Sequence, residues 1–218
     1  MAKINSLAHL QDALDRDFAW RKKEISDLKI QCEIAPQNII MHKSAILLIY
    51  AHWEGFIKNA AKNYLEFLNN QKLLCKDMQE NFLILHLGGV FQQELNYKNF
   101  SHRGKILTEF NNSLTCKFKV CTDKTINTNS NLKSENFKLI LEQLGIPQHR
   151  FELKFQIIDE KLLQYRNAIA HGETRPNSDI CSVVSDIKDV IVELLNEFHS
   201  QILTAAEEKR YLKIKTKE

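Results

Sequence analysis

Apolar residues recur at spacings of three and four along most of the chain, which is the spacing of one buried helix face. Residues 5–29 show this stripe with charged residues between its members, as expected for an amphipathic helix. Residues 38–74 differ, because apolar side chains fill every face near the start of this segment. A helix that is apolar all round lies in the middle of a bundle. The pattern therefore predicts a helical bundle whose central helix is 38–74.

Turn-forming residues divide the remaining helical pattern. Pro36 separates the first two helices, since proline disrupts a helix interior. The stretch 113–131 is rich in Thr, Asn, Ser and Lys and predicts a polar loop insertion or a short extended excursion. Further helices are expected at 77–112 with an interruption at Gly88-Gly89, at 134–144 ending before Gly145 and Pro147, at 155–170, and from about 178 to 206. We expect an all-α bundle of long antiparallel helices, with one domain over 1–206 and a basic C-terminal tail over 207–218.

Composition narrows the class of protein without naming a function. Six glycines and three prolines in 218 residues are too few for the many tight turns of an all-β fold. The formal charge of +3 permits a nucleic-acid partner but does not argue for one. The N-terminus lacks the apolar region of a signal peptide, and no apolar run is long enough to span a bilayer. The five cysteines are odd in number and scattered, as in the reducing cytoplasm, where we expect the protein.

Metal and cofactor sites are not indicated by the sequence. Cys116 and Cys121 form a C-x4-C pair without a second pair of ligands nearby, so zinc is not favoured there. The eight histidines do not cluster at metal-ligand spacing, and Gly88-Gly89 lacks the ending of a phosphate-binding loop. We therefore expect no metal and no cofactor.

Chemistry is indicated instead by Arg166 and His171, which frame an R-x4-H pattern late in the 155–170 helix. Gly172 is a plausible residue just past the helix end, which would place His171 at that end. Five residues turn an ideal helix by about 140°, so a bend or termination after Ala170 is needed to bring the two side chains together. The alternative is structural: Arg166 pairs with a helix carboxylate, and His171 caps the C-terminus, where an imidazolium meets the helix dipole favourably.

The segment 165–173 (YRNAIAHGE) resembles the signature of the HEPN superfamily (higher eukaryotes and prokaryotes nucleotide-binding). Segments 50–56 (YAHWEGF) and 127–132 (NTNSNL) are similar to one large prokaryotic branch of it, the MAE-type branch. Together the resemblance covers most of the chain. It implies a helical bundle that commonly pairs, so that two such motifs meet in one cleft, and an endoribonuclease of a toxin–antitoxin or antiviral defence system.

Carried over residue by residue, the resemblance implies that Arg166, Asn167 and His171 are the motif residues. In one toxin branch a Tyr follows two residues after the His and is modified by an antitoxin. Glu173 occupies that position here, which puts that mode of control in doubt.

These residue types suit cleavage of RNA by its own 2′-OH. An imidazole titrates near neutral pH and can take or give a proton, and a guanidinium offers two donors to phosphate oxygens. Asn167 can donate to a phosphate or orient the imidazole. We expect 2′,3′-cyclic phosphate and 5′-OH ends without a metal, and a homodimer that supplies a second His171 to the cleft.

Other residues have weaker assignments. Glu54 follows the most apolar part of the central helix and orients Arg166 or His171, or else forms a structural salt bridge with a nearby Lys. Lys209, Arg210 and Asn131 are candidate RNA contacts, with a solvated helix end and turn formation as their structural alternatives.

The preferred function is a metal-independent endoribonuclease with an RNA substrate, acting in a toxin–antitoxin or antiviral module and possessing an antitoxin or defence partner protein. The alternative is a non-catalytic helical module that binds RNA or a protein. A helical DNA-binding regulator is disfavoured, because no helix-turn-helix with a basic recognition helix is evident.

Overall fold

A computed structural model describes residues 3–91, 100–129, 131–173 and 180–214, and these residues form an all-α bundle without a strand. Three long helices dominate the described part: α1 (Leu7–Ile34), α2 (Ile39–Asn70) and α9 (Ile180–Glu207). Shorter elements follow α2 in the chain: a 3₁₀ turn (Cys75–Asp77), α3 (Glu80–Phe91), α4 (Phe100–Leu114), α5 (Thr122–Thr125), α6 (Ser134–Leu144), a second 3₁₀ turn (Gln148–Arg150), α7 (Glu152–Gln156), a π-helix (Ile157–Leu163) and α8 (Gln164–Ala170). The predicted all-α fold is confirmed.

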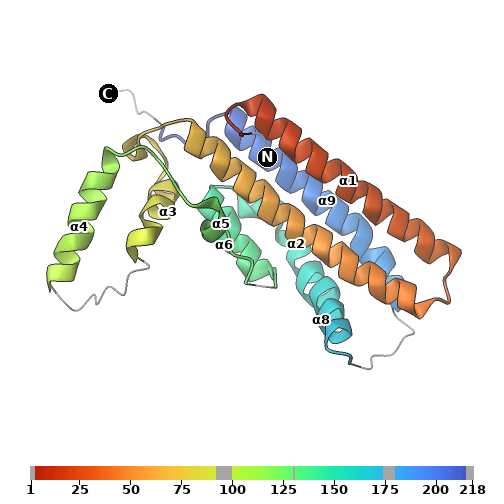
Figure 1. Cartoon of the computed structure of the whole chain (residues 1–218). Helices are drawn as coiled ribbons and strands as arrows, with labels where there is room; N and C mark the ends of the chain where they lie inside the picture. The colour runs from red at the N-terminus through yellow and green to blue at the C-terminus, as the bar shows by residue number, and fades with distance from the viewer. Residues whose placement is uncertain (1–2, 92–99, 130, 174–179, 215–218) are drawn as a thin grey trace.

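The long helices lie side by side, with α6 and α8 packed under α2 and the α3–α4 pair at one end (Figure 1). Contacts from α1 to α9 join Asp15 to His199 and Glu33 to Lys188, so these helices are antiparallel. Helix α2 packs against α1, α9 and α8. Its interior side chains, including Trp53, Phe56 and Tyr64, are fully buried. The prediction of a central helix is confirmed.

Most helices end near the proline and glycine residues that the sequence analysis identified as helix ends. Helix α1 ends at Ile34, two residues before Pro36. Helix α6 ends at Leu144 and is capped by Gly145, whose φ of +67° favours glycine. The predicted interruption at Gly88-Gly89 is wrong, because α3 continues to Phe91. Buried Phe82, Leu83 and Leu87 hold α3 on the core, and tertiary packing of this kind overrides the low helix propensity of glycine.

The polar insertion after α4 is mostly non-helical, yet it is anchored to the core. Phe118 and Leu132 are buried, and the side chain of Asn69 holds both backbone groups of Val120 at 2.9 and 3.0 Å. An isolated bridge between Leu74 and Lys117 is present there, rather than a strand pair. The insertion is thus a fixed part of the bundle, and its end, residues 131–132, lies against α2.

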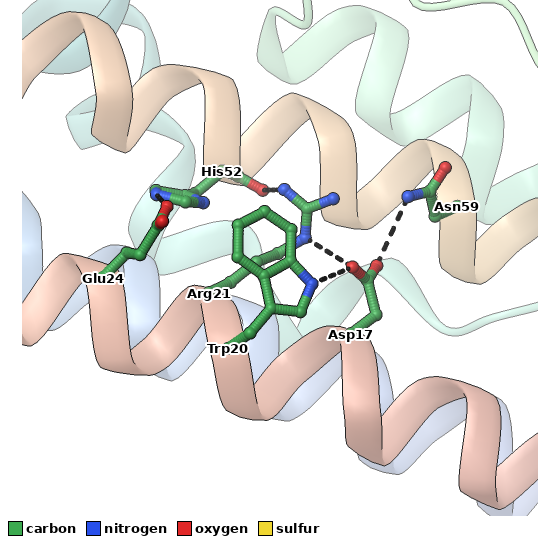
Figure 2. Close-up of polar contacts among 6 residues, drawn as sticks. All are labelled: Asp17, Trp20, Arg21, Glu24, His52 and Asn59. Carbon is green, nitrogen blue, oxygen red and sulfur yellow. Dashed lines mark hydrogen bonds and ion pairs between the residues drawn. The ribbon is translucent and has the colours of Figure 1, made fainter.

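A buried arginine joins α1 to α2 (Figure 2). Arg21 is 6% exposed, and its Nε donates to Asp17 Oδ1 at 2.9 Å. Its guanidinium stacks on Trp20 at 4.4 Å and donates to the carbonyl oxygen of His52 at 3.5 Å. Gly55 makes this approach possible, because a Cβ at that position would lie 2.8 Å from Arg21 Nη1.

His52 belongs to the same cluster and is structural. The ring is 4% exposed and meets Trp20 edge-on at 5.3 Å. Glu24 Oε2 lies 3.1 Å from Nε2 but outside hydrogen-bond alignment, and neither ring nitrogen has a hydrogen-bond partner among the described residues. Burial and the nearby Arg21 lower the pKa of His52 and outweigh the attraction of Glu24.

In the described residues, no helix combines the length and the apolarity that crossing a membrane requires.

We predict that Gly55→Ala destabilises the protein by about 1–3 kcal/mol, although alanine normally strengthens a helix. The new methyl group must displace a guanidinium that is buried and bonded to Asp17. Gly104→Ala is the matched control, since no atom lies within 4 Å of its added Cβ, and it should stabilise by up to about 1 kcal/mol. Urea unfolding measures both, and equal stabilisation by the two variants would show that Arg21 moves away at little cost.

We predict that the free energy of unfolding decreases as the pH is lowered below about 6.5, in part because of His52. The lowered pKa means that the unfolded chain takes up a proton at His52 before the folded chain does, so acid favours unfolding. Urea unfolding between pH 7 and pH 5 should show a shallower pH dependence for His52→Gln than for the wild type. His149→Gln is the matched surface substitution, and curves of equal slope for wild type and His52→Gln would refute the assignment.

Candidate functional site

The Arg166–His171 segment forms α8 and its C-terminus. The helix closes with a Schellman motif, in which Gly172 N–H donates to Ile169 O at 3.2 Å and Glu173 N–H donates to Ala168 O at 2.9 Å. Gly172 has a φ of +69°, so it occupies the predicted position just past the helix, and His171 is the helix C-cap. The imidazole is therefore presented at an exposed helix end.

Arg166 lies in a different setting, half-buried against α2. Its guanidinium carbon is 4.6 Å from the centre of the Tyr50 ring, and Nη1 donates to Asn167 Oδ1 at 2.9 Å. Stacking on Tyr50 occupies the flat face of the guanidinium, while the N–H groups lie in its plane. The guanidinium is thus positioned by stacking on Tyr50 and by one hydrogen bond to Asn167. Its other N–H groups remain as donors that an anion could accept from.

Asn167 has a more specific role than the sequence indicated. Its Oδ1 accepts from Arg166, so this amide helps to fix the cation. Within the described residues, its Nδ2 makes no hydrogen bond. The amide hydrogens therefore remain as donors beside Arg166.

Glu54 approaches the site through Tyr50. Its carboxylate lies close enough to the phenol for its charge to influence it, and the described residues include no ion pair of Glu54 with a Lys or Arg. Burial raises the pKa of Tyr50 to about 12, and the Glu54 charge contributes to the rise. Tyr50 consequently stays protonated at neutral pH.

An open pocket runs from α8 to the loop before α6. Asn131 and Asn167 both line it, together with Lys133, Asp159, Leu163 and Gln164. Asn131 Oδ1 is a buried acceptor without a hydrogen-bond partner among the described residues. The structure thus brings Asn131 to the motif, although the two are far apart in the sequence.

Asp159 closes the other side of this pocket and holds α6 in place. Its carboxylate accepts from the backbone N–H of Ser134 at 2.9 Å and from the Ser134 hydroxyl. A carboxylate at a helix N-terminus is favourable because the first N–H groups lack partners. Asp159 lies within the π-helix, and π-helical turns occur often at functional sites.

Lys209 and Arg210 lie far from the Arg166 pocket, at the other end of α2. Both are exposed, but the backbone around them folds onto the bundle, and Tyr211 is buried against Phe67. Gln79 N–H donates to Tyr211 O at 2.9 Å, and this fixes the segment near α3 (Figure 1). Because Tyr50 and Phe67 are 17 residues apart on α2, this end lies about 25 Å along that helix from Arg166. Residues 215–218 of the predicted tail are outside the described residues.

The sequence reasoning assigned no role to Tyr50, Asp159 and Gln164. Tyr50 could have been noticed, because it precedes Glu54 by four residues and shares its helix face. Asp159 gave no such signal, since its place in the pocket depends on the π-helical turn. No group of three or more His, Cys, Asp or Glu side chains in the described part of the chain could hold a metal ion.

Comparison with known protein families gives a match over most of the chain. The protein-family model described as RiboL-PSP-HEPN matches residues 16–204, which include α2, the pocket and α8. No curated protein and no solved structure matches the chain. Placement in the MAE-type branch remains a prediction. Because the match covers most of the chain, this protein belongs to the RiboL-PSP-HEPN family and so to the HEPN superfamily, whose domains are of a nuclease or RNA-binding kind.

Proposed function

We propose that this protein is a metal-independent endoribonuclease with Arg166, Asn167 and His171 at its active site. The observation that supports it most is the setting of Arg166, which is held over Tyr50 and by Asn167 beside an open pocket. An arginine held in this way is suited to a phosphate, because its planar N–H donors match two phosphate oxygens.

In the proposed reaction, the 2′-OH of RNA attacks the adjacent phosphorus. An imidazole takes the 2′-OH proton, the bond from phosphorus to the 5′-oxygen breaks, and the leaving 5′-oxygen receives a proton. Arg166 and the Asn167 amide stabilise the negative charge of the phosphorane. The products are a 2′,3′-cyclic phosphate and a 5′-OH, and DNA is inert because it has no 2′-OH.

The exposed position of His171 supports a two-chain cleft. Within one chain, Arg166 faces α2 while His171 is at the exposed end of α8. A two-fold homodimer that joins the ends of two α8 helices places a second His171 in the cleft, which provides one imidazole for each proton transfer.

Outer contacts to RNA are assigned to Asn131, Lys209 and Arg210. Asn131 offers an acceptor in the pocket beside Asn167, where a base or ribose donor can bind. Lys209 and Arg210 are exposed cations about 25 Å away along α2, so they contact a more distant phosphate of a longer RNA. Glu54 supports Arg166 indirectly, through Tyr50.

The biological setting proposed is a cytoplasmic toxin–antitoxin or antiviral module with an antitoxin or defence partner protein. Family membership supports this setting. The second candidate function is a non-catalytic module that binds RNA or a protein. The exposed His171 side chain, which makes no hydrogen bond within the described residues, is compatible with it.

We predict that the wild type cleaves a mixed RNA pool in the presence of EDTA and that His171→Ala lowers the rate by about 10²-fold or more. Mass spectrometry of the ends should find cyclic phosphates from the wild type, and a DNA pool should stay intact. His149→Ala removes another exposed histidine and should cleave like the wild type.

Equal cleavage by the wild type and His171→Ala would contradict the proposed chemistry. If neither cleaves at high enzyme concentration while both retain labelled RNA in a gel shift, the binding-module function is favoured instead. Loss of that retention in Arg166→Ala would then identify the same pocket as the binding site.

A further inference from the structure

We propose that Tyr50 is a positioning residue that sets the place of both Arg166 and the Asn131 loop, and so determines the geometry of the phosphate site. The proposal rests on the proposed function for its catalytic consequence, but the positioning itself does not depend on RNA cleavage. It follows from two contacts that meet at one side chain.

The first contact is the stacking of Arg166 on the phenol ring, with 4.6 Å between the guanidinium carbon and the ring centre. Tyr50 is 4% exposed and lies on the central helix, so the ring is a fixed surface. An aromatic face attracts a cation through its quadrupole, and the attraction is larger where water is excluded. The ring therefore limits where the guanidinium can lie.

The second contact joins Tyr50 to the loop. Its phenol oxygen accepts from the backbone N–H of Leu132 at 2.8 Å, and Trp53 Nε1–H donates to the carbonyl oxygen of the same residue at 3.3 Å. Leu132 itself is fully buried. Both backbone groups of Leu132 are thus held by α2, and Asn131, the preceding residue, is held beside Asn167 in the pocket.

Together these contacts make Tyr50 the link between the two walls of the site. One wall is α8 with Arg166, and the other is the loop with Asn131. The width of the pocket then depends on the phenol, whose ring holds one wall while its oxygen holds the other.

The experiment is a double-mutant cycle of Tyr50→Leu and Arg166→Ala, measured as kcat and KM for RNA cleavage. We expect Tyr50→Leu to lower kcat about tenfold when Arg166 is present. In the Arg166→Ala background, the same substitution should leave kcat unchanged. Tyr50→Phe keeps the ring and loses the Leu132 contact, so it should raise KM several-fold with little change in kcat. Equal losses of kcat in both backgrounds would overturn the proposal, since a purely structural role lowers both alike.

Tyr64→Leu is the matched control for lost packing. Tyr64 is a fully buried tyrosine on the same helix, and its hydroxyl has no hydrogen-bond partner among the described residues. This variant should lower the unfolding free energy at least as much as Tyr50→Leu and leave kcat of the folded protein unchanged. A kcat loss equal to that of Tyr50→Leu would also overturn the proposal.

A second measurement does not depend on activity. The Nε–H resonance of Arg166, assigned by its absence from Arg166→Ala, should carry a ring-current shift that is present in Tyr50→Phe and lost in Tyr50→Leu. An unchanged resonance in Tyr50→Leu would overturn the proposal. If the wild type fails to cleave RNA, the proposed function fails while this resonance still decides whether Tyr50 positions Arg166.

Discussion

The structure depends on the burial of most of α2 against α1, α9 and α8. One face of α2 stays exposed at Leu48 and Ala51, while its other faces supply the core. Burial of an unpaired polar group is costly. The phenol oxygen of Tyr50 is paired with the backbone N–H of Leu132, in the loop that covers it. The candidate site is thus built where the core meets the covering segments.

Two arginines in this protein show how burial determines a role. Arg21 is almost completely buried and has a structural role. It donates to Asp17 and to the His52 carbonyl, and its guanidinium face stacks on Trp20. Arg166 is half-buried, and one face and one donor are engaged, while the adjoining pocket is open. The same type of side chain therefore joins two helices in one place and retains hydrogen-bond donors beside an open pocket in the other.

The helical pattern was sufficient to predict the long helices, because it reports burial directly. The central position of α2 and the end of α8 at Gly172 followed from apolar periodicity and from glycine geometry. Arg21 shows a limit of this reasoning, since it occupies a core position in the apolar stripe of α1 but was not given a role there. The continuation of α3 through Gly88-Gly89 could not be predicted, because it depends on distant packing rather than on local propensity.

The candidate site was predictable only in part. The R-x4-H segment was visible in the sequence, and Asn131 now lies beside it in the pocket, but the link through Tyr50 needed the structure. Lys209 and Arg210 were grouped with the motif by charge alone, and the fold separates them from it by much of the length of α2. Charge identifies a candidate contact with RNA, whereas the path of the chain decides whether it is local.

The π-helix before α8 sets the rotational phase of the motif. Each of its hydrogen-bonded rings includes one more residue than an α-helical ring. Residues 157–163 therefore include one residue more than an α-helix would need for the same turn. If the same residues were wound as a regular α-helix, the following side chains would turn by about 100° relative to the preceding ones. Arg166 would then leave the Tyr50 ring even though every contacting residue remained in the sequence. The register of the chain, counted in residues from Asp159, is therefore as much a part of this site as the identity of its side chains.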